Sequence, residues 1–316
     1  MDSNKKPLVI LAGPTAVGKT ALSISLAKAI NGEIISADSM QVYKKMNIGT
    51  AKITPEETQG VPHYLIDVFM PDEEFHVAKF KEYANQYIQE IYNKGKIPIL
   101  VGGTGFYIQA VVKDVVFTEE KETASRKKWE KIAKEKGAHY VHDELKKVDP
   151  ESAIAIHENN VRRVIRALEY FEQTGEKISV HNKTEQERES PYHYAYFVLN
   201  QNRDVLYNRI ETRIDEMIKM GLVEEVQNLL LAGYQRNLTS MQGLGYKEIC
   251  AYLAGECSLE EAIYILKRDT RHFAKRQLTW FKREKSVEWV DKDCLPTQEQ
   301  QLEYCIAKLR EKKILL

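Results

Sequence analysis

Short runs of hydrophobic residues alternate with amphipathic segments along the first part of the chain, up to about residue 116. Four of these runs have the length of a strand, at residues 8–12, 33–36, 63–66 and 97–101. Before the last run, hydrophobic residues recur at helical spacing from Val77 to Tyr92, and Gly95 follows as a helix stop. Strands that alternate with helices are typical of a parallel sheet covered by helices. We therefore predict an α/β core for this part of the chain.

The pattern changes between about residue 119 and residue 190, where Lys, Arg and Glu are frequent and β-branched runs are rare. This segment predicts successive helices, at residues 123–136, 139–148, 150–156 and 160–174. Residues 194–199 return to a strand pattern, and the remainder is mostly helical with one short strand at 287–290. We expect residues 1–118 and 191–316 to form the core, and residues 119–190 to form a helical insertion domain.

The composition is that of a folded protein with balanced charge. The chain has 316 residues, of which 43% are hydrophobic and 29% charged, so it can bury a large core. Lys and Arg number 46, as do Asp and Glu, and only local clusters of charge can therefore indicate a nucleic-acid partner. The four cysteines lack metal-binding spacing and predict reduced thiols. The sequence shows neither a secretory leader nor an apolar stretch of about 18 residues. We expect a cytoplasmic monomer without membrane contact.

A complete phosphate-binding loop follows the first predicted strand and opens a helix, in the sequence Gly13-Pro14-Thr15-Ala16-Val17-Gly18-Lys19-Thr20. Its glycines let backbone N–H groups turn toward a phosphate, and the N-terminus of the helix adds positive potential. Lys19 supplies a charge for the terminal phosphates, and the Thr20 hydroxyl is suited to Mg²⁺. The loop predicts a phosphorylated ligand but does not identify it.

A nucleotide hydrolase usually pairs such a loop with a second strand that ends in an acid. The strand at 97–101 ends instead in Gly102-Gly103-Thr104-Gly105, without a carboxylate. Asp38 follows the strand at 33–36, and ligands of open parallel sheets bind outside the carboxyl ends of the strands. Asp38 is therefore a candidate for chemistry on a second substrate.

Clusters of basic residues follow in the second half of the chain. Arg209 and Arg213 share one helix face and suit a single anion, although both could instead pair with nearby acidic residues. Residues 267–283 carry seven cations and one anion, which favours a helix that follows a phosphate backbone. The alternative is a solvated helix whose aromatic residues are core. Further basic patches lie at Arg126–Lys128 and Arg162–Arg166, and a glycine turn with a cation lies at Gly243–Lys247.

Six segments together resemble bacterial tRNA dimethylallyltransferases, and the resemblance covers about residues 8 to 290. They are Gly13–Thr20, Ile35–Tyr43, Met46–Lys52, Val61–Asp67, Gly102–Tyr107 and Lys275–Phe281. The resemblance implies a P-loop NTPase-like core. It also implies transfer of a dimethylallyl group from dimethylallyl diphosphate to N6 of adenosine 37, beside the tRNA anticodon.

The resemblance implies a role for each part of the site. Asp38 would accept the proton of the amine as general base. Thr15, Lys19, Arg213 and a Mg²⁺ ion at Thr20 would stabilise the leaving diphosphate. The anticodon stem-loop of tRNA would contact Asp38, Ser39, Met40, Gln41, Thr104, Arg126, Arg162, Arg163, Arg166, Gln242, Gly243, Leu244, Gly245, Tyr246, Lys247, Lys275, Arg276, Gln277, Thr279, Trp280 and Lys282. A phosphate contact at Gln242 is the least expected, because the family often has a cation there.

Three other functions share some of these features. A P-loop kinase for a small metabolite would use the loop and Asp38 but not the basic helix. An enzyme that prenylates a free adenine nucleotide would not need the basic insertion. An RNA-binding module without catalysis would leave the phosphate loop without a role.

Overall fold

The computed structural model describes residues 5–117 and 123–315 and divides the chain into two compact units. The first unit combines Met1–Val112 with Pro191–Leu316, and the second is Lys113–Ser190. The boundary expected at residues 118 and 119 falls outside the described residues. The second unit ends at Ser190 in the structure, and the domain bounds taken from the sequence stay a prediction.

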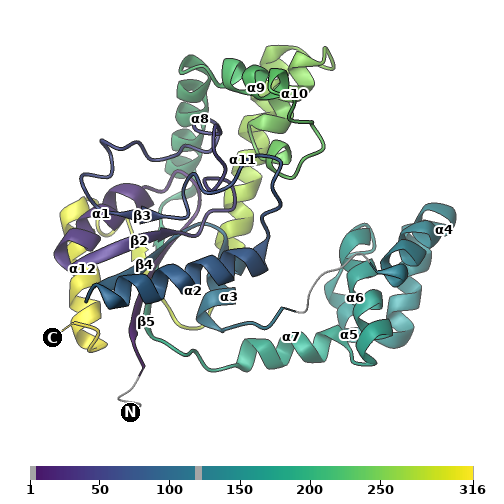
Figure 1. Ribbon diagram of the computed structural model, residues 1–316, viewed down its shortest axis with the longest axis horizontal. Helices are drawn as coiled ribbons and strands as arrows, with labels where there is room; N and C mark the ends of the chain where they lie inside the picture. The colour runs from purple at the N-terminus through teal and green to yellow at the C-terminus, as the bar shows by residue number, and fades with distance from the viewer. Residues whose placement is uncertain (1–4, 118–122, 316) are drawn as a thin grey trace. The chain divides into compact units, whose positions relative to one another are not determined.

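The first unit is built on a six-stranded sheet with the order β3-β2-β4-β1-β5-β6, in which every pair is parallel (Figure 1). The strands are β1 (Pro7–Ala12), β2 (Gly32–Ser36), β3 (His63–Tyr64), β4 (Ile97–Gly102), β5 (His193–Asn200) and β6 (Val287–Asp291). The predicted α/β fold with a parallel sheet is therefore confirmed. β3 is shorter than expected because Leu65 and Asp67 adopt positive φ angles of 60° and 55°, which end the extended conformation.

Helices cover both faces of this sheet (Figure 1). The helices α1 (Lys19–Ala29) and α12 (Gln298–Glu311) contact each other on one face. The helices α2 (Val77–Asn93) and α3 (Gly105–Val112) contact each other on the other face. The central strands are buried on both sides, as parallel strands between helix layers usually are. Their carboxyl ends meet at one edge, which positions the candidate site.

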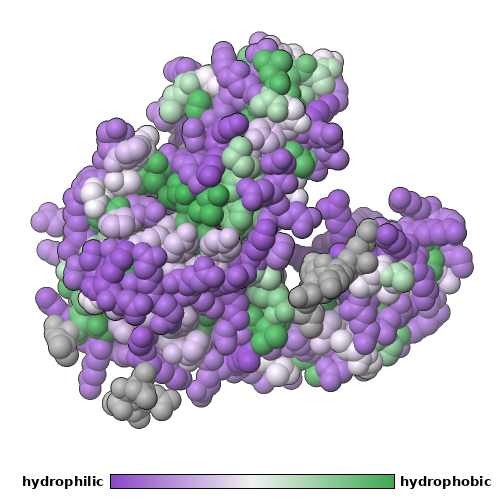
Figure 2. Space-filling model, viewed as in Figure 1, coloured by the Kyte–Doolittle hydropathy of each residue, from purple (hydrophilic) through white to green (hydrophobic). Residues whose placement is uncertain are grey.

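A group of helices follows β5. It consists of α8 (Arg203–Lys219), α9 (Leu222–Leu231), the short 3₁₀ helix η1 (Ser240–Gln242), α10 (Tyr246–Leu253) and α11 (Leu259–Phe281). The helix α11 contacts α8, α10 and α3, so it joins this group to the sheet. The face seen in Figure 2 is largely hydrophilic, and hydrophobic residues gather over the loops between the sheet and α8. Within the described residues, none of the helices combines the length and the hydrophobicity that a membrane span requires.

The second unit is helical and has its own hydrophobic core. Its helices are α4 (Ala124–Val148), α5 (Pro150–Ala155), α6 (Val161–Thr174) and α7 (Ile178–Glu187). The sequence predicts two helices where α4 lies, and α4 is indeed interrupted at Gly137, whose φ of 86° and ψ of 169° are not helical. The helix α7 was not predicted. Its sequence is mostly polar and gives no hydrophobic periodicity to find.

Candidate functional site

The phosphate-binding loop joins β1 to α1, as the sequence predicts. Gly13 and Gly18 have φ angles of 151° and 98°, and a Cβ atom on Gly13 would lie 2.9 Å from the carbonyl oxygen of Leu199. Glycine is therefore required at position 13 both by the backbone and by the neighbouring strand. The Lys19 Nζ donates to the carbonyl oxygens of Gly13 (2.9 Å) and Pro14 (2.8 Å). Lys19, at the end of the loop, is thus hydrogen-bonded to the two residues at its start.

Gln277 fastens this loop to the end of β4. Its Oε1 accepts from the N–H of Thr15 at 2.9 Å, and its Nε2 donates to the carbonyl oxygen of Gly103 at 2.9 Å. A Cβ atom on Gly103 would lie 2.2 Å from this Nε2, so the amide occupies the space that a larger residue would fill. Gln277 is buried, and its amide is used inside the protein. The tRNA contact expected at Gln277 stays a prediction.

Asp38 lies just past the carboxyl end of β2, beside the end of β4. Its Oδ1 accepts from the N–H groups of Met40 (2.8 Å) and Gln41 (3.2 Å), which fixes the carboxylate in a local turn. The N–H of Thr104 donates to the carbonyl oxygen of Ala37 at 3.4 Å. The structure therefore brings Asp38 and Thr104 together at the edge where the sequence places them.

Asp38 lies close enough to Lys19 and Arg213 to act on the pKa of both. Burial lowers the pKa of Lys19 to about 8, and the Asp38 charge opposes this shift while the Arg213 charge adds to it. Burial also lowers the pKa of Arg213, again against the effect of Asp38. Two cations and one carboxylate from three separate elements thus converge at the phosphate-binding loop.

In the described part of the chain, Glu211 and Asp215 of α8 do not pair with Arg209 or Arg213 of the same helix. Glu211 accepts from Arg271, and Asp215 pairs with Lys267 at 2.7 Å, so both acids bind cations of α11. Arg213 forms no ion pair among the described residues, and the charge of Asp38 acts on its pKa. Binding of a single anion by Arg209 and Arg213 stays a prediction.

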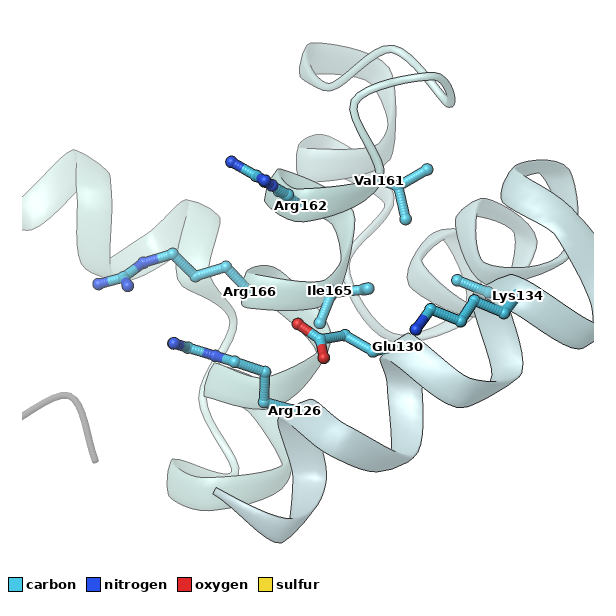
Figure 3. Close-up of a pocket in the computed structure, with 8 residues that line it drawn as sticks. Arg126, Glu130, Lys134, Val161, Arg162, Ile165 and Arg166 are labelled. Carbon is cyan, nitrogen blue, oxygen red and sulfur yellow. The ribbon is translucent and has the colours of Figure 1, made fainter. Parts of the chain in front are cut away.

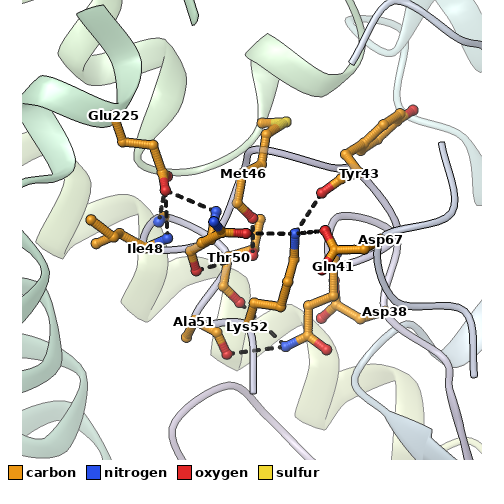
Figure 4. Close-up of polar contacts among 12 residues, drawn as sticks. Asp38, Gln41, Tyr43, Met46, Ile48, Thr50, Ala51, Lys52, Asp67 and Glu225 are labelled. Atoms are coloured by element: carbon orange, nitrogen blue, oxygen red, sulfur yellow. Dashed lines mark hydrogen bonds and ion pairs between the residues drawn. The ribbon is translucent and has the colours of Figure 1, made fainter. Parts of the chain in front are cut away.

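Glu225 holds the loop that follows Asp38, and sequence reasoning missed it. Its carboxylate accepts from three consecutive backbone N–H groups, those of Asn47 (2.8 Å), Ile48 (2.8 Å) and Gly49 (3.1 Å) (Figure 4). The Tyr246 hydroxyl donates to the same carboxylate at 2.7 Å. A lone glutamate on a surface helix gives no sequence signal of this role.

The same loop reaches Asp38 through Gln41 (Figure 4). The Gln41 Nε2 donates to the carbonyl oxygens of Thr50 and Ala51, both at 3.3 Å, and the Ser36 hydroxyl donates to its Oε1 at 3.2 Å. Since the backbone N–H of Gln41 also binds Asp38, residues 46–52 and the carboxylate share one hydrogen-bonded network.

The turn at 242–247 packs against this network, but its aromatic residue is not on the surface. Tyr246 is fully buried, and a Cβ atom on Gly49 would lie 2.6 Å from its ring. The ring is buried and its hydroxyl binds Glu225, and the tRNA contact expected at this residue stays a prediction. Gln242 is exposed and donates to a backbone carbonyl, and Lys247 lies 3.5 Å from Asp269.

The basic helix α11 has two halves that differ in their partners. Lys267, Arg268 and Arg271 in its first half all pair with carboxylates. Lys275, Arg276 and Lys282 toward its end are exposed, and no carboxylate among the described residues pairs with them. Thr279 is also exposed, whereas Trp280 packs on Gly105 and against the ring of Phe106, with centroids 6.1 Å apart. Among the described residues, the cations of this segment that lack a carboxylate partner therefore lie toward the end of the helix.

The second unit holds a separate basic pocket of about 710 Å³ between α4 and α6. The guanidinium groups of Arg126, Arg162 and Arg166 point to one side of it, and Glu130 and Lys134 also line it (Figure 3). Arg126 binds Glu169 through Nε (3.0 Å) and a terminal nitrogen (2.9 Å), which fixes its direction. Arg163, next to this pocket, is exposed.

Within the described residues, no cluster of three or more His, Cys, Asp or Glu side chains could hold a metal ion by itself. The Thr20 side chain is exposed at the first turn of α1, beside Lys19. A hydroxyl at this position fits an ion such as Mg²⁺ that takes its other ligands from phosphate and water.

Known proteins resemble this chain over most of its length. A family model described as IPP transferase matches residues 41–284. The chain is 63% identical over 98% of its length to a tRNA dimethylallyltransferase of Lachnoclostridium phytofermentans, of which it covers 99%. It is 53% identical over 90% of its length to one of Carboxydothermus hydrogenoformans, of which it covers 91%.

Solved structures of related enzymes also superpose on this chain. The tRNA isopentenylpyrophosphate transferase of Bacillus halodurans superposes with a TM-score of 0.74 at 46% identity, and 98% of each chain is covered. A eukaryotic dimethylallyltransferase acting on tRNA has a TM-score of 0.82 at 31% identity, with 98% of this chain and 79% of the other covered. The P-loop-like α/β fold, the edge that holds Asp38 and the extent of these matches lead to one conclusion: the chain belongs to the IPP transferase family.

Proposed function

We propose that this protein transfers a dimethylallyl group from dimethylallyl diphosphate to N6 of adenosine 37 in tRNA, giving N6-(dimethylallyl)adenosine and diphosphate. One observation carries the proposal: a carboxylate, Asp38, lies at the same edge of the sheet as a complete phosphate-binding loop, within electrostatic reach of Lys19 and Arg213. Family membership and the names of the relatives support the substrates.

In this reaction the bond between C1 of the prenyl group and its oxygen breaks, and N6 forms a new bond to C1. The exocyclic amine is a poor nucleophile and becomes acidic only as the new bond forms. Asp38 accepts its proton at that stage as general base. The N–H groups of the loop, Lys19 and Arg213 stabilise the negative charge that develops on the diphosphate.

We propose Mg²⁺ as the metal, with the Thr20 hydroxyl as its ligand from the protein. When bound, the ion neutralises charge on the diphosphate as a Lewis acid. The exposed side chain of Thr20 next to Lys19 supports this position.

The tRNA contacts are also part of the proposal. Adenosine 37 must leave its stack to reach the edge of the sheet that holds Asp38. Exposed cations without a carboxylate partner suit the phosphates of the anticodon stem-loop, and among the described residues Lys275, Arg276 and Lys282 have this property. Arg126, Arg162 and Arg166 around the basic pocket of the second unit suit the same partner. We propose a cytoplasmic location, where a tRNA substrate is available.

Mass spectrometry of nucleosides tests the reaction. The purified protein is incubated with unmodified tRNA and dimethylallyl diphosphate, and N6-(dimethylallyl)adenosine is expected in the digest. Parallel reactions replace tRNA with AMP, replace the prenyl donor with ATP, or use tRNA with guanosine at position 37. Product from AMP but not from tRNA, or phosphorylated product from ATP, would reject the proposal in favour of the alternatives.

A further inference from the structure

Lys292 contacts the phosphate-binding loop from the end of β6, the edge strand that pairs with β5. It follows β6 directly, and its backbone N–H donates to the carbonyl oxygen of Asn200 at 3.0 Å, which fixes its position beside β5. Its Nζ donates to the carbonyl oxygen of Val17 within the loop, also at 3.0 Å. This cation lies 275 residues from the loop in sequence and belongs to none of the motifs.

A second cation lies against the same point. A Cβ atom built on Gly18 would lie 3.0 Å from the Lys292 Nζ and 3.4 Å from a terminal nitrogen of Arg209. Gly18 is the residue that opens α1, and it is followed by Lys19. The two cationic groups therefore lie beside the last glycine of the loop, next in sequence to Lys19.

These cations repel one another in the free protein. Burial lowers the pKa of Lys292, and the charge of Arg209 lowers it further. The charge of Arg209 also lowers the pKa of Arg213. Among the described residues, no carboxylate forms an ion pair with Lys292 or Arg209, and the N-terminus of α1 adds positive potential. Charges of one sign that are gathered without a partner indicate a site for an anion of high charge.

We propose that Lys292 and Arg209 bind the diphosphate group, and that they complete on the β5–β6 side a cradle that Lys19 and Arg213 form on the other. The inference rests on the proposed function for the identity of the donor. Free diphosphate carries one more negative charge than its prenyl ester. Additional cations therefore stabilise the departing group more than the bound donor, which favours cleavage of the C1–O bond.

The alternative is that Lys292 only braces the loop through Val17. Two variants separate these roles, because Arg209 is exposed and makes no hydrogen bond to the loop among the described residues. Lys292→Gln and Arg209→Gln remove one charge each. Lys312→Gln is the matched control, since Lys312 is a partly exposed cation of the same unit that pairs with Glu288.

Calorimetric titration with inorganic pyrophosphate and Mg²⁺ measures the site without requiring prenyl transfer. We expect affinity to fall by about ten- to a hundredfold for Lys292→Gln and for Arg209→Gln, the range for a hydrogen bond to a charged group. The control should bind pyrophosphate as the parent does, and tRNA affinity should not change in any variant. Lys292→Arg should recover most of the lost affinity.

Unchanged pyrophosphate affinity in both variants would overturn the proposal. A loss confined to Lys292→Gln, together with a lower melting temperature, would also overturn it in favour of the bracing role. Failure of the proposed function has a different signature, because pyrophosphate would still bind while no prenylated nucleoside forms.

Discussion

Glu225→Gln offers a quantitative test of how the loop after Asp38 is held. The carboxylate accepts four hydrogen bonds at 2.7–3.1 Å, three from backbone N–H groups and one from Tyr246. The amide keeps the size of the side chain but replaces one acceptor oxygen with a donor, so about half of these bonds are lost. Hydrogen bonds to charged groups contribute about 1.5–3 kcal/mol each. Water can replace the bond at the exposed Asn47, and we therefore expect a loss of about 2–4 kcal/mol in the free energy of unfolding.

Urea denaturation followed by circular dichroism measures this loss. Glu224→Gln is the control, because Glu224 is the neighbouring residue on α9 and is exposed. We also expect a lower kcat with little change in KM for dimethylallyl diphosphate, since the loop contacts Asp38 through Gln41 and not the phosphate-binding loop. A variant within about 0.5 kcal/mol of the control, the usual range for surface substitutions, would refute the reasoning.

Three further outcomes are expected. Asp38→Asn should lower turnover at least about a hundredfold with unchanged pyrophosphate affinity, and single-turnover kinetics that match the parent would exclude Asp38 as the base. Neutralising Lys275, Arg276 and Lys282 together should reduce the slope of log tRNA affinity against log salt by about two to three units, and a parental slope would assign these cations to a merely solvated surface. Burial lowers the pKa of Lys19 to about 8 in the folded protein, whereas the unfolded chain keeps the ordinary value of 10.5. Between these two pH values the unfolded chain binds more protons than the folded protein, so the contribution of Lys19 to the free energy of unfolding rises as the pH rises. Pyrophosphate binding above pH 8 should accordingly take up a proton, seen as a buffer-dependent binding enthalpy that disappears in Lys19→Met.

The sequence predicts those parts of the site that depend on local structure. The phosphate-binding loop and Asp38 each follow a strand directly, and parallel strands place their carboxyl ends at one edge. Their proximity therefore follows from the fold class alone. The strand pattern of residues 194–199 is equally local, and β5 lies there.

Residues that act through distant contacts could not be assigned in the same way. Gln277 belongs to a segment rich in cations, which favours a surface role, yet it joins two loops inside the protein. Tyr246 follows a glycine turn that suits contact with RNA, but Gly49 leaves space for its ring, and this pairing depends on tertiary structure. The charge pattern of α11 also overstates the number of unpaired cations, because α8 supplies carboxylate partners for Lys267 and Arg271.

The helix α11 has 23 residues and is about 35 Å long, and it carries both the contact to the phosphate-binding loop and the exposed cations. Its middle turns pair with α8 through Lys267 and Arg271, Gln277 holds the phosphate-binding loop, and the exposed cations lie on either side of Gln277 toward the end of the helix. One inserted residue between Arg271 and Gln277 would rotate every later side chain by about 100°. Such a change would release the loop and turn the cations to another face in a single step. The length of α11 should therefore be fixed among proteins that share this arrangement, whereas the loops at its two ends are free to vary.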